Sequence, residues 1–179
     1  MCKTLLFAAM SFWAAMPAAA AGLRGGGCAV PNFGLAFGTI NSLMATPGTI
    51  SFPATNPNAG VVSGSSSATI SWTVQNGSPL QSWTISVQAS ASTFTGCSTV
   101  PVSAVSVACA SASVGGGGGT GSCGGAMTLS TVAQQVAAGV EGDGTQSYLV
   151  LINYTLAESW RYVANSSCTL TLTYTVNAP

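Results

Sequence analysis

Few side chains in this sequence could carry out acid–base chemistry. They are Glu141, Asp143 and Glu158, and the chain contains no histidine. Catalytic arrangements that depend on histidine are therefore excluded. Two carboxylates could together hydrolyse a glycosidic bond. However, Glu141 and Asp143 stand in a glycine-flanked turn at 139–144, where carboxylates are usually solvated, so we predict no enzyme activity and no cofactor.

The cysteines are the other reactive groups, and five of the six lie beyond residue 21. Without a CxxC pair or histidine, a zinc site is not expected, and an exported chain of this kind favours disulfides. We predict a Cys109–Cys123 bridge, because the glycines between them let the chain double back. It would contribute about 3 kcal/mol to stability. We expect Cys28–Cys168 as the second pair, with Cys97 left over; other pairings stay open.

Five consecutive glycines stand at 115–119. A phosphate-binding P-loop would need a lysine followed by serine or threonine at the start of a helix, and neither is present. Glycine has no side chain to pack and loses much entropy on ordering. We therefore predict a mobile glycine-rich loop at 114–125.

The segment 158–162 reads Glu-Ser-Trp-Arg-Tyr. Tryptophan, tyrosine and arginine are enriched at interaction hot spots, and loops on a rigid scaffold often carry binding groups. The simpler expectation is that Trp160 closes one end of the fold and that Glu158 pairs with Arg161. The competing hypothesis is a contact patch of Trp160, Arg161 and Tyr162 for a wall polymer or a neighbouring subunit.

The first residues resemble an export signal. A lysine precedes an apolar run at 5–16, Pro17 and small residues at 18–21. We predict that 1–21 is a cleaved signal peptide and that 22–179 is one secreted domain, free or in the cell envelope.

Charge is almost absent, with three basic and three acidic residues in the whole chain. Nucleic-acid binding and attachment to an acidic membrane both need clustered lysine and arginine, so neither is expected. No stretch after the leader is long enough to span a membrane as a helix. Because the net charge is zero, self-association is not strongly opposed.

Two neighbouring stretches, 66–75 and 82–90, alternate between apolar and polar residues and each contains one tryptophan. This period of two predicts strands with one apolar face. Turn-forming residues at 76–79 join them, so we predict a hairpin whose Trp72 and Trp83 are buried in one core.

The rest of the chain repeats this pattern at short intervals and contains no convincing long helix. The sequence thus predicts an all-β protein: a single disulfide-containing antiparallel β-sandwich of about seven to nine strands, immunoglobulin-like or pilin-like. The further strands that we expect are an edge strand at 28–40, a short strand at 49–53, a strand with a bulge near 103–104 at 100–109, a strand at 126–132, a central strand apolar on both faces at 147–156, and a last strand at 167–176. The expected connections are loops at 41–48 and 54–64 and a helical turn or irregular segment at 133–138.

Two segments resemble the WxL class of bacterial cell-surface domains. Trp83-Thr84-Ile85 is similar to its Trp-x-Leu motif. Its distal motif, Tyr-x3-Leu-x-Trp-x-Leu-x3-Pro, is matched in spacing by Tyr148, Ile152, Tyr154, Leu156 and Trp160, where isoleucine, tyrosine and tryptophan replace leucine, tryptophan and proline. The resemblance implies a secreted β-sandwich that associates non-covalently with the cell wall.

A second resemblance is to spore-coat-protein-U-like and pilin-like sandwiches. It depends on Asn32-Phe33-Gly34 and Phe37-Gly38-Thr39-Ile40, which follow Cys28. It implies an exported bacterial β-sandwich with a surface or assembly role. We therefore expect a non-catalytic structural or adhesive protein whose partners are a cell-wall polymer or other surface subunits. The alternative is a module that binds a wall polymer or another carbohydrate.

Overall fold

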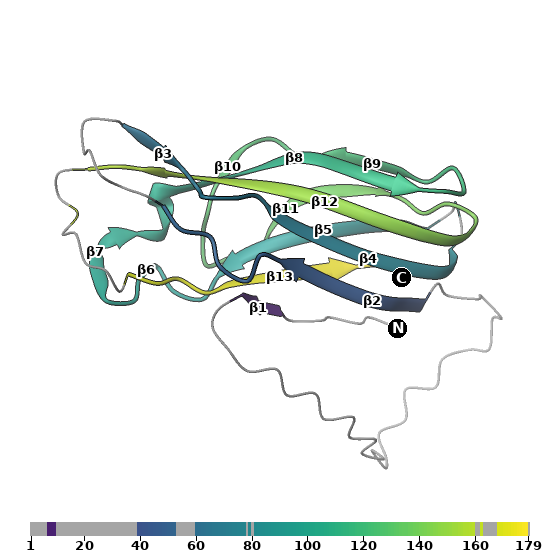
Figure 1. The fold of residues 1–179 in the computed structure, drawn as a ribbon, viewed down its shortest axis with the longest axis horizontal. Helices are drawn as coiled ribbons and strands as arrows, with labels where there is room; N and C mark the ends of the chain where they lie inside the picture. The colour runs from purple at the N-terminus through teal and green to yellow at the C-terminus, as the bar shows by residue number, and fades with distance from the viewer. Residues whose placement is uncertain are drawn as a thin grey trace, which may run out of the picture.

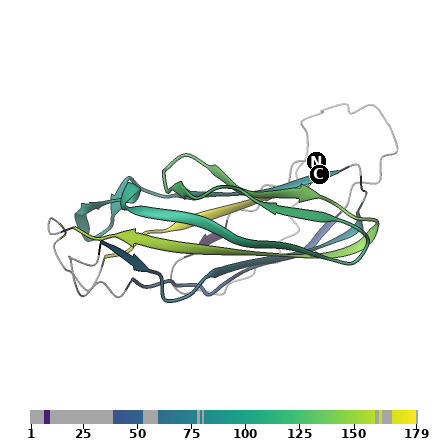
Figure 2. The ribbon, with the colours of Figure 1, turned by 90° about the horizontal axis from the view of Figure 1, so that it is seen from above.

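A computed structural model describes residues 7–9, 39–52, 60–77, 79, 81–159, 162 and 168–178. In these residues the chain is built from antiparallel strands that form two facing sheets, with the long strands running along the length of the molecule (Figures 1 and 2). Two disulfides are present. The predicted all-β, disulfide-containing antiparallel sandwich is therefore confirmed.

The first sheet, sheet A, has the strand order β1-β13-β5-β11-β9, and the second, sheet B, has the order β10-β8-β12-β4-β2. The strands of sheet A are β1 (Phe7–Ala9), β13 (Leu172–Asn177), β5 (Ser82–Ala89), β11 (Gln134–Val140) and β9 (Thr120–Cys123). Those of sheet B are β10 (Met127–Thr128), β8 (Val105–Gly115), β12 (Gly144–Ala157), β4 (Ala68–Gly77) and β2 (Thr39–Thr46), and β3 (Val61–Ser63) also pairs with β12. A small separate ladder joins β6 (Thr93–Phe94) to β7 (Cys97–Pro101).

The centre of the core is an aromatic cluster contributed by both sheets. Trp72 of β4 stacks on Tyr148 of β12, with 4.8 Å between ring centroids. Trp83 of β5 meets Trp72 edge to face from the other sheet, at 5.2 Å. Both tryptophans are almost fully buried, so their predicted placement in one core is confirmed.

The predicted tryptophan hairpin, in contrast, is wrong. β4 lies in sheet B between β12 and β2, whereas β5 lies in sheet A between β13 and β11. The two tryptophans meet because the sheets face each other, and not because their strands are hydrogen-bonded. Alternation fixes which face of a strand is apolar but leaves its partner strand open.

The strand boundaries also differ from expectation before residue 64. Residues 41–46, expected as a loop, belong to β2, and 49–52, expected as a strand, lie outside every strand. β2 ends at Thr46, where the following Pro47 has no N–H to continue the ladder. β3 forms within the stretch expected to be a turn. Of the predicted edge strand at 28–40, only Thr39 and Ile40 are among the described residues, and they begin β2.

Between residues 100 and 140 the chain contains more β-structure than its sequence suggests. The change of apolar phase near Ser103 comes from a 3-10 turn at Val102–Ala104, and not from a bulge. Residues 134–138, expected to be helical or irregular, lie in β11, because β5 and β9 pair with this strand on its two sides. The strand expected at 126–132 is reduced to β10.

The glycine-rich segment is not the long mobile loop that we predicted. β8 continues to Gly115 and β9 begins at Thr120, so the turn is confined to 116–119. Gly116, Gly117 and Gly118 have φ values of 90°, 54° and 78°. Residues with a side chain rarely adopt this left-handed conformation, so glycine is what allows so tight a turn.

A hydrogen bond in the core joins the sheets through Tyr154 of β12 and Tyr174 of β13, whose hydroxyl oxygens are 2.6 Å apart. Burial raises the pKa of Tyr174 to about 12, although its hydrogen bond with Tyr154 acts in the opposite direction. Burial, and then the neighbouring Tyr174, raise the pKa of Tyr154 well above its ordinary value.

This tyrosine pair predicts loss of stability in alkali. An unfolded tyrosine loses its proton near pH 10, about two pH units before folded Tyr174 does. The part of the folding stability that comes from keeping the buried tyrosines protonated is therefore complete below pH 10. It is lost as the pH rises towards 12 and beyond. Thermal melts between pH 9 and 12 should show a smaller decrease for the Tyr154→Phe/Tyr174→Phe double variant than for wild type. Tyr162→Phe is the control, and equal decreases in all three proteins would contradict the prediction.

Candidate functional site

A shallow hollow lies on the outer face of sheet B, where β4, β12 and β8 run side by side. Because strand residues alternate, Trp72 and Tyr148 point into the core and their neighbours point outwards. The hollow has a volume of about 340 Å³. Its outward-facing lining is uncharged and consists of Ser71, Thr73, Ser113, Ser147 and Leu149.

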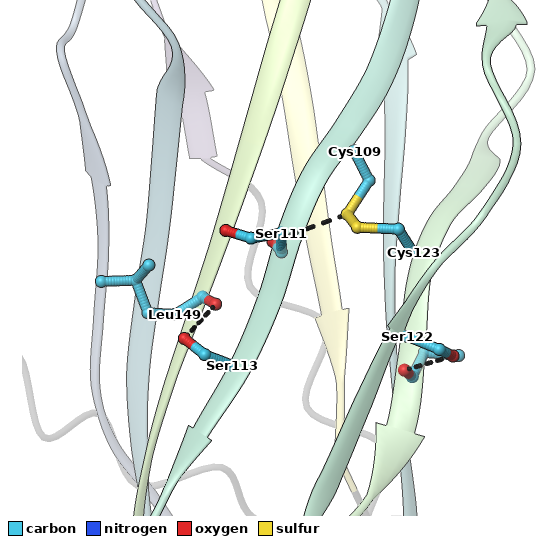
Figure 3. The surroundings of a disulfide bond; sticks show 7 residues. Cys109, Ser111, Ser113, Ser122, Cys123 and Leu149 are labelled. Carbon is cyan, nitrogen blue, oxygen red and sulfur yellow. Dashed lines mark hydrogen bonds between the residues drawn. A yellow bond between two sulfur atoms is a disulfide. The ribbon is translucent and has the colours of Figure 1, made fainter.

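The strand register brings these hydroxyl groups together. Leu149 pairs with Ser71 on one side and with Ser113 on the other, and Ser147 pairs with Thr73. The Ser113 hydroxyl donates a hydrogen bond to the carbonyl oxygen of Leu149 over 3.2 Å (Figure 3). A hydroxyl-rich ligand could exchange hydrogen bonds with this surface, while Leu149, 38% exposed, offers a small apolar contact.

The exposure of the outer residues of β12 corrects an expectation. The central strand at 147–156 was expected to be apolar and buried on both faces, but only its inward-facing residues are buried. The hollow could not be predicted from the sequence, although the alternation of Ser71 and Thr73 with apolar residues was recognised. Its lining comes from three strands, and the register between them cannot be read from alternation.

The Cys109–Cys123 disulfide lies beside this face and confirms the first predicted pair. Cys109 is in β8 of sheet B and Cys123 is in β9 of sheet A, so the bond ties the two sheets together at one side of the sandwich (Figure 3). The Cα atoms are 5.2 Å apart, within the usual range. The sulfur of Cys109 lies 3.6 Å from the carbonyl oxygen of Ser111, a contact only, because a disulfide sulfur has no proton to donate.

The second predicted pair is wrong, because Cys168 is bonded to Cys97 and not to Cys28. Cys97, expected to be left over, lies at the start of β7, which pairs with β6. The neighbouring Thr95 forms two backbone hydrogen bonds with Thr169, and this contact holds the two cysteines close together. Cys28 is outside the described residues.

Of the carboxylates, Glu141 differs most from expectation. It was expected to be solvated, but it is only 1% exposed, whereas Asp143 is exposed. Every second residue at the end of β11 points into the core. Gly139 packs against Trp83, and Glu141, two residues later, points to the same side. Its N–H donates a hydrogen bond to the carbonyl oxygen of Gln81 over 2.8 Å. Burial raises the pKa of Tyr148, and the Glu141 carboxylate raises it further.

Beside Glu141, the turn that contains Gly142 packs against the glycine turn at 116–119. A Cβ added at Gly142 would lie 2.5 Å from the carbonyl oxygen of Gly117 and 2.6 Å from the nitrogen of Gly119. The N–H of Asp143 donates to the carbonyl oxygen of Gly117 over 3.0 Å. The buried Gln146 side chain donates to the carbonyl oxygen of Asp143 over 2.6 Å. These contacts explain the conformation of the two turns.

The predicted contact patch is described only in part. Trp160 and Arg161 lie outside the described residues. Tyr162 is half-buried against the core, and its N–H donates to the carbonyl oxygen of Ser159 over 3.0 Å. Glu158 is also half-buried, at the end of β12. The described part of this segment therefore packs on the sandwich.

Within the residues that the structure describes, no helix has the length and apolarity needed to cross a membrane. The same residues contain no cluster of three or more cysteine or acidic side chains placed to hold a metal ion. No protein-family model, curated protein or solved structure matches this chain.

Proposed function

We propose that the protein is a non-catalytic structural or adhesive β-sandwich, exported to the cell surface. The observation that best supports this proposal is the uncharged face of sheet B, whose hydroxyl groups are placed together by the strand register. The two disulfides support an oxidising compartment outside the cytoplasm.

The alternative is a module that binds a neutral wall polymer or another carbohydrate. The hollow favours it, because four serine and threonine hydroxyls surround one aliphatic side chain and no charge is present. Sugars offer hydroxyl groups and apolar C–H faces to such a surface. The Trp160–Tyr162 patch remains a second candidate for the same contact.

A binding experiment on isolated cell envelopes tests the proposal. The protein should co-sediment with the envelope, and Ser71→Gln and Ser113→Gln should each reduce binding about tenfold by filling the hollow and disturbing its hydrogen bonds. Ser86→Gln is the matched control, because Ser86 is half-buried on the outer face of sheet A. Trp160→Ala and Arg161→Ala test the predicted patch in the same way.

The outcomes separate the candidates. Loss of binding in the two hollow variants alone supports the face of sheet B, and loss in the Trp160 and Arg161 variants alone supports the patch. Competition by a soluble neutral polysaccharide favours the carbohydrate-binding alternative. A wild-type protein that remains wholly in the supernatant contradicts a surface role.

A further inference from the structure

One edge of sheet A is covered by a strand from the segment expected to be a signal peptide. β1 (Phe7–Ala9) pairs antiparallel with β13, in the register Phe7 to Tyr174, Ala8 to Thr173 and Ala9 to Leu172 (Figure 1). The other side of β13 is paired with β5 over all six residues. Among the described residues, β1 is the strand that pairs with this side of β13. Export as proposed above would remove β1 and expose this side for pairing.

β13 carries none of the features that normally keep an edge strand from pairing. Its sequence, Leu-Thr-Tyr-Thr-Val-Asn, contains no charge, proline or glycine, and its register with β5 has no irregularity. The other sheet edges differ. β9 is short and tied to β8 by a disulfide, and β2 has a register shift between Ile40 and Ser42.

We propose that, once β1 is removed, β13 pairs with β13 of a second copy of this chain and so joins two sandwiches into a dimer. The proposal rests on the proposed export. The edge already accepts an antiparallel strand, and two identical edges related by a two-fold axis are antiparallel to each other. Sheet A would then continue from β9 of one copy, through both β13 strands, to β9 of the other.

The side chains of β13 suit this pairing. Tyr174 and Val176 are buried on the inner face, so the paired strands would place matching apolar residues on the core side. Thr173 and Thr175 alternate with them; Thr173 is buried and Thr175 is half-buried. Threonines that face each other across two strands form favourable pairs. Beyond residue 21 the chain has two basic and three acidic residues, so its formal net charge is −1 and leaves little long-range repulsion between copies.

The test is the oligomeric state of the exported protein, purified after secretion from the full-length gene. Its first residue is determined by mass spectrometry, and its mass by light scattering between about 5 and 500 µM. The expected result is a mature chain lacking Phe7–Ala9 that dimerises with increasing concentration. Thr175→Lys should raise the dimer dissociation constant at least tenfold, because charged side chains near the centre of the paired strands oppose strand pairing. Thr120→Lys, the same change on the opposite edge strand β9, should have no effect.

A mixing experiment excludes misfolding as the cause. Thr175→Lys and Thr175→Glu should each be monomeric and folded, with the near-UV spectrum of the tryptophan cluster intact, and their mixture should form a heterodimer. Asn177→Lys, at the exposed end of β13, is the second variant if Thr175→Lys does not fold.

Three results would overturn the proposal: a monomer at every concentration, an exported protein that retains Phe7–Ala9, or equal effects of Thr175→Lys and Thr120→Lys. A monomer that still binds cell envelopes would remove this dimer and leave the proposed function standing. A dimer that does not bind envelopes would support the pairing of β13 and contradict the proposed surface role.

Discussion

Replacing Trp72 or Trp83 with alanine is expected to lower the free energy of unfolding by about 3–5 kcal/mol. Each removes an almost fully buried ring from a cluster in which Trp72 stacks on Tyr148 and meets Trp83 across the sheets. The strands on both sides are hydrogen-bonded to their neighbours and cannot collapse far into the cavity. Guanidinium denaturation, followed by tryptophan fluorescence and circular dichroism, measures the effect.

Val132→Ala is the control for this experiment, since Val132 is 70% exposed and should be nearly neutral when truncated. A change of less than about 1 kcal/mol in both tryptophan variants would mean that the cluster is not the centre of the core.

Removal of the Cys97–Cys168 bridge by a double alanine substitution is expected to destabilise the protein by about 4 kcal/mol. The bridge joins residues 71 positions apart, so it strongly restricts the unfolded chain. The Cys109–Cys123 bridge spans only 14 positions and should contribute about 3 kcal/mol. Chemical denaturation of the two double-alanine variants, without reductant, tests this order.

Peptide mapping under non-reducing conditions provides the accompanying check. A linked pair of peptides containing Cys97 and Cys168 should be found. A peptide that joins Cys168 to Cys28, or a larger destabilisation on loss of the shorter bridge, would contradict the assignment.

The features predicted correctly from sequence are those that depend on a single strand or on residues close together in the chain. The alternation around Trp72 and Trp83 predicted two strands and their buried faces, because side-chain direction in a strand has a period of two. The Cys109–Cys123 pair was predictable because only 14 positions and a flexible glycine stretch separate its members.

The features that depend on partner strands were not predictable. Alternation could not show that β4 and β5 belong to different sheets, or that Cys97 rather than Cys28 approaches Cys168. β11 contains alanine, glutamine and glycine, which favour strands weakly, and it forms because it is paired on both sides.

The candidate site shows the same division. Ser71 and Thr73 were recognised as a polar phase of their strand, but the hollow exists only when three strands lie in register. Glu141 was expected to be solvated because its neighbours are turn residues, and packing of the glycine turns buried it instead.

The Cys97–Cys168 bridge also bears on how the molecule would respond to a mechanical load. A pull on the two ends of the chain would pass directly through this bond. The chain between the two cysteines, which includes the central strand β12, would be shielded from stretching while the bond is intact. At about 3.4 Å per residue, some 240 Å of contour length would be withheld from extension. A protein anchored by one end to a surface would therefore extend under force by less than its full chain length, because β8 to β12 would remain within a covalently closed loop.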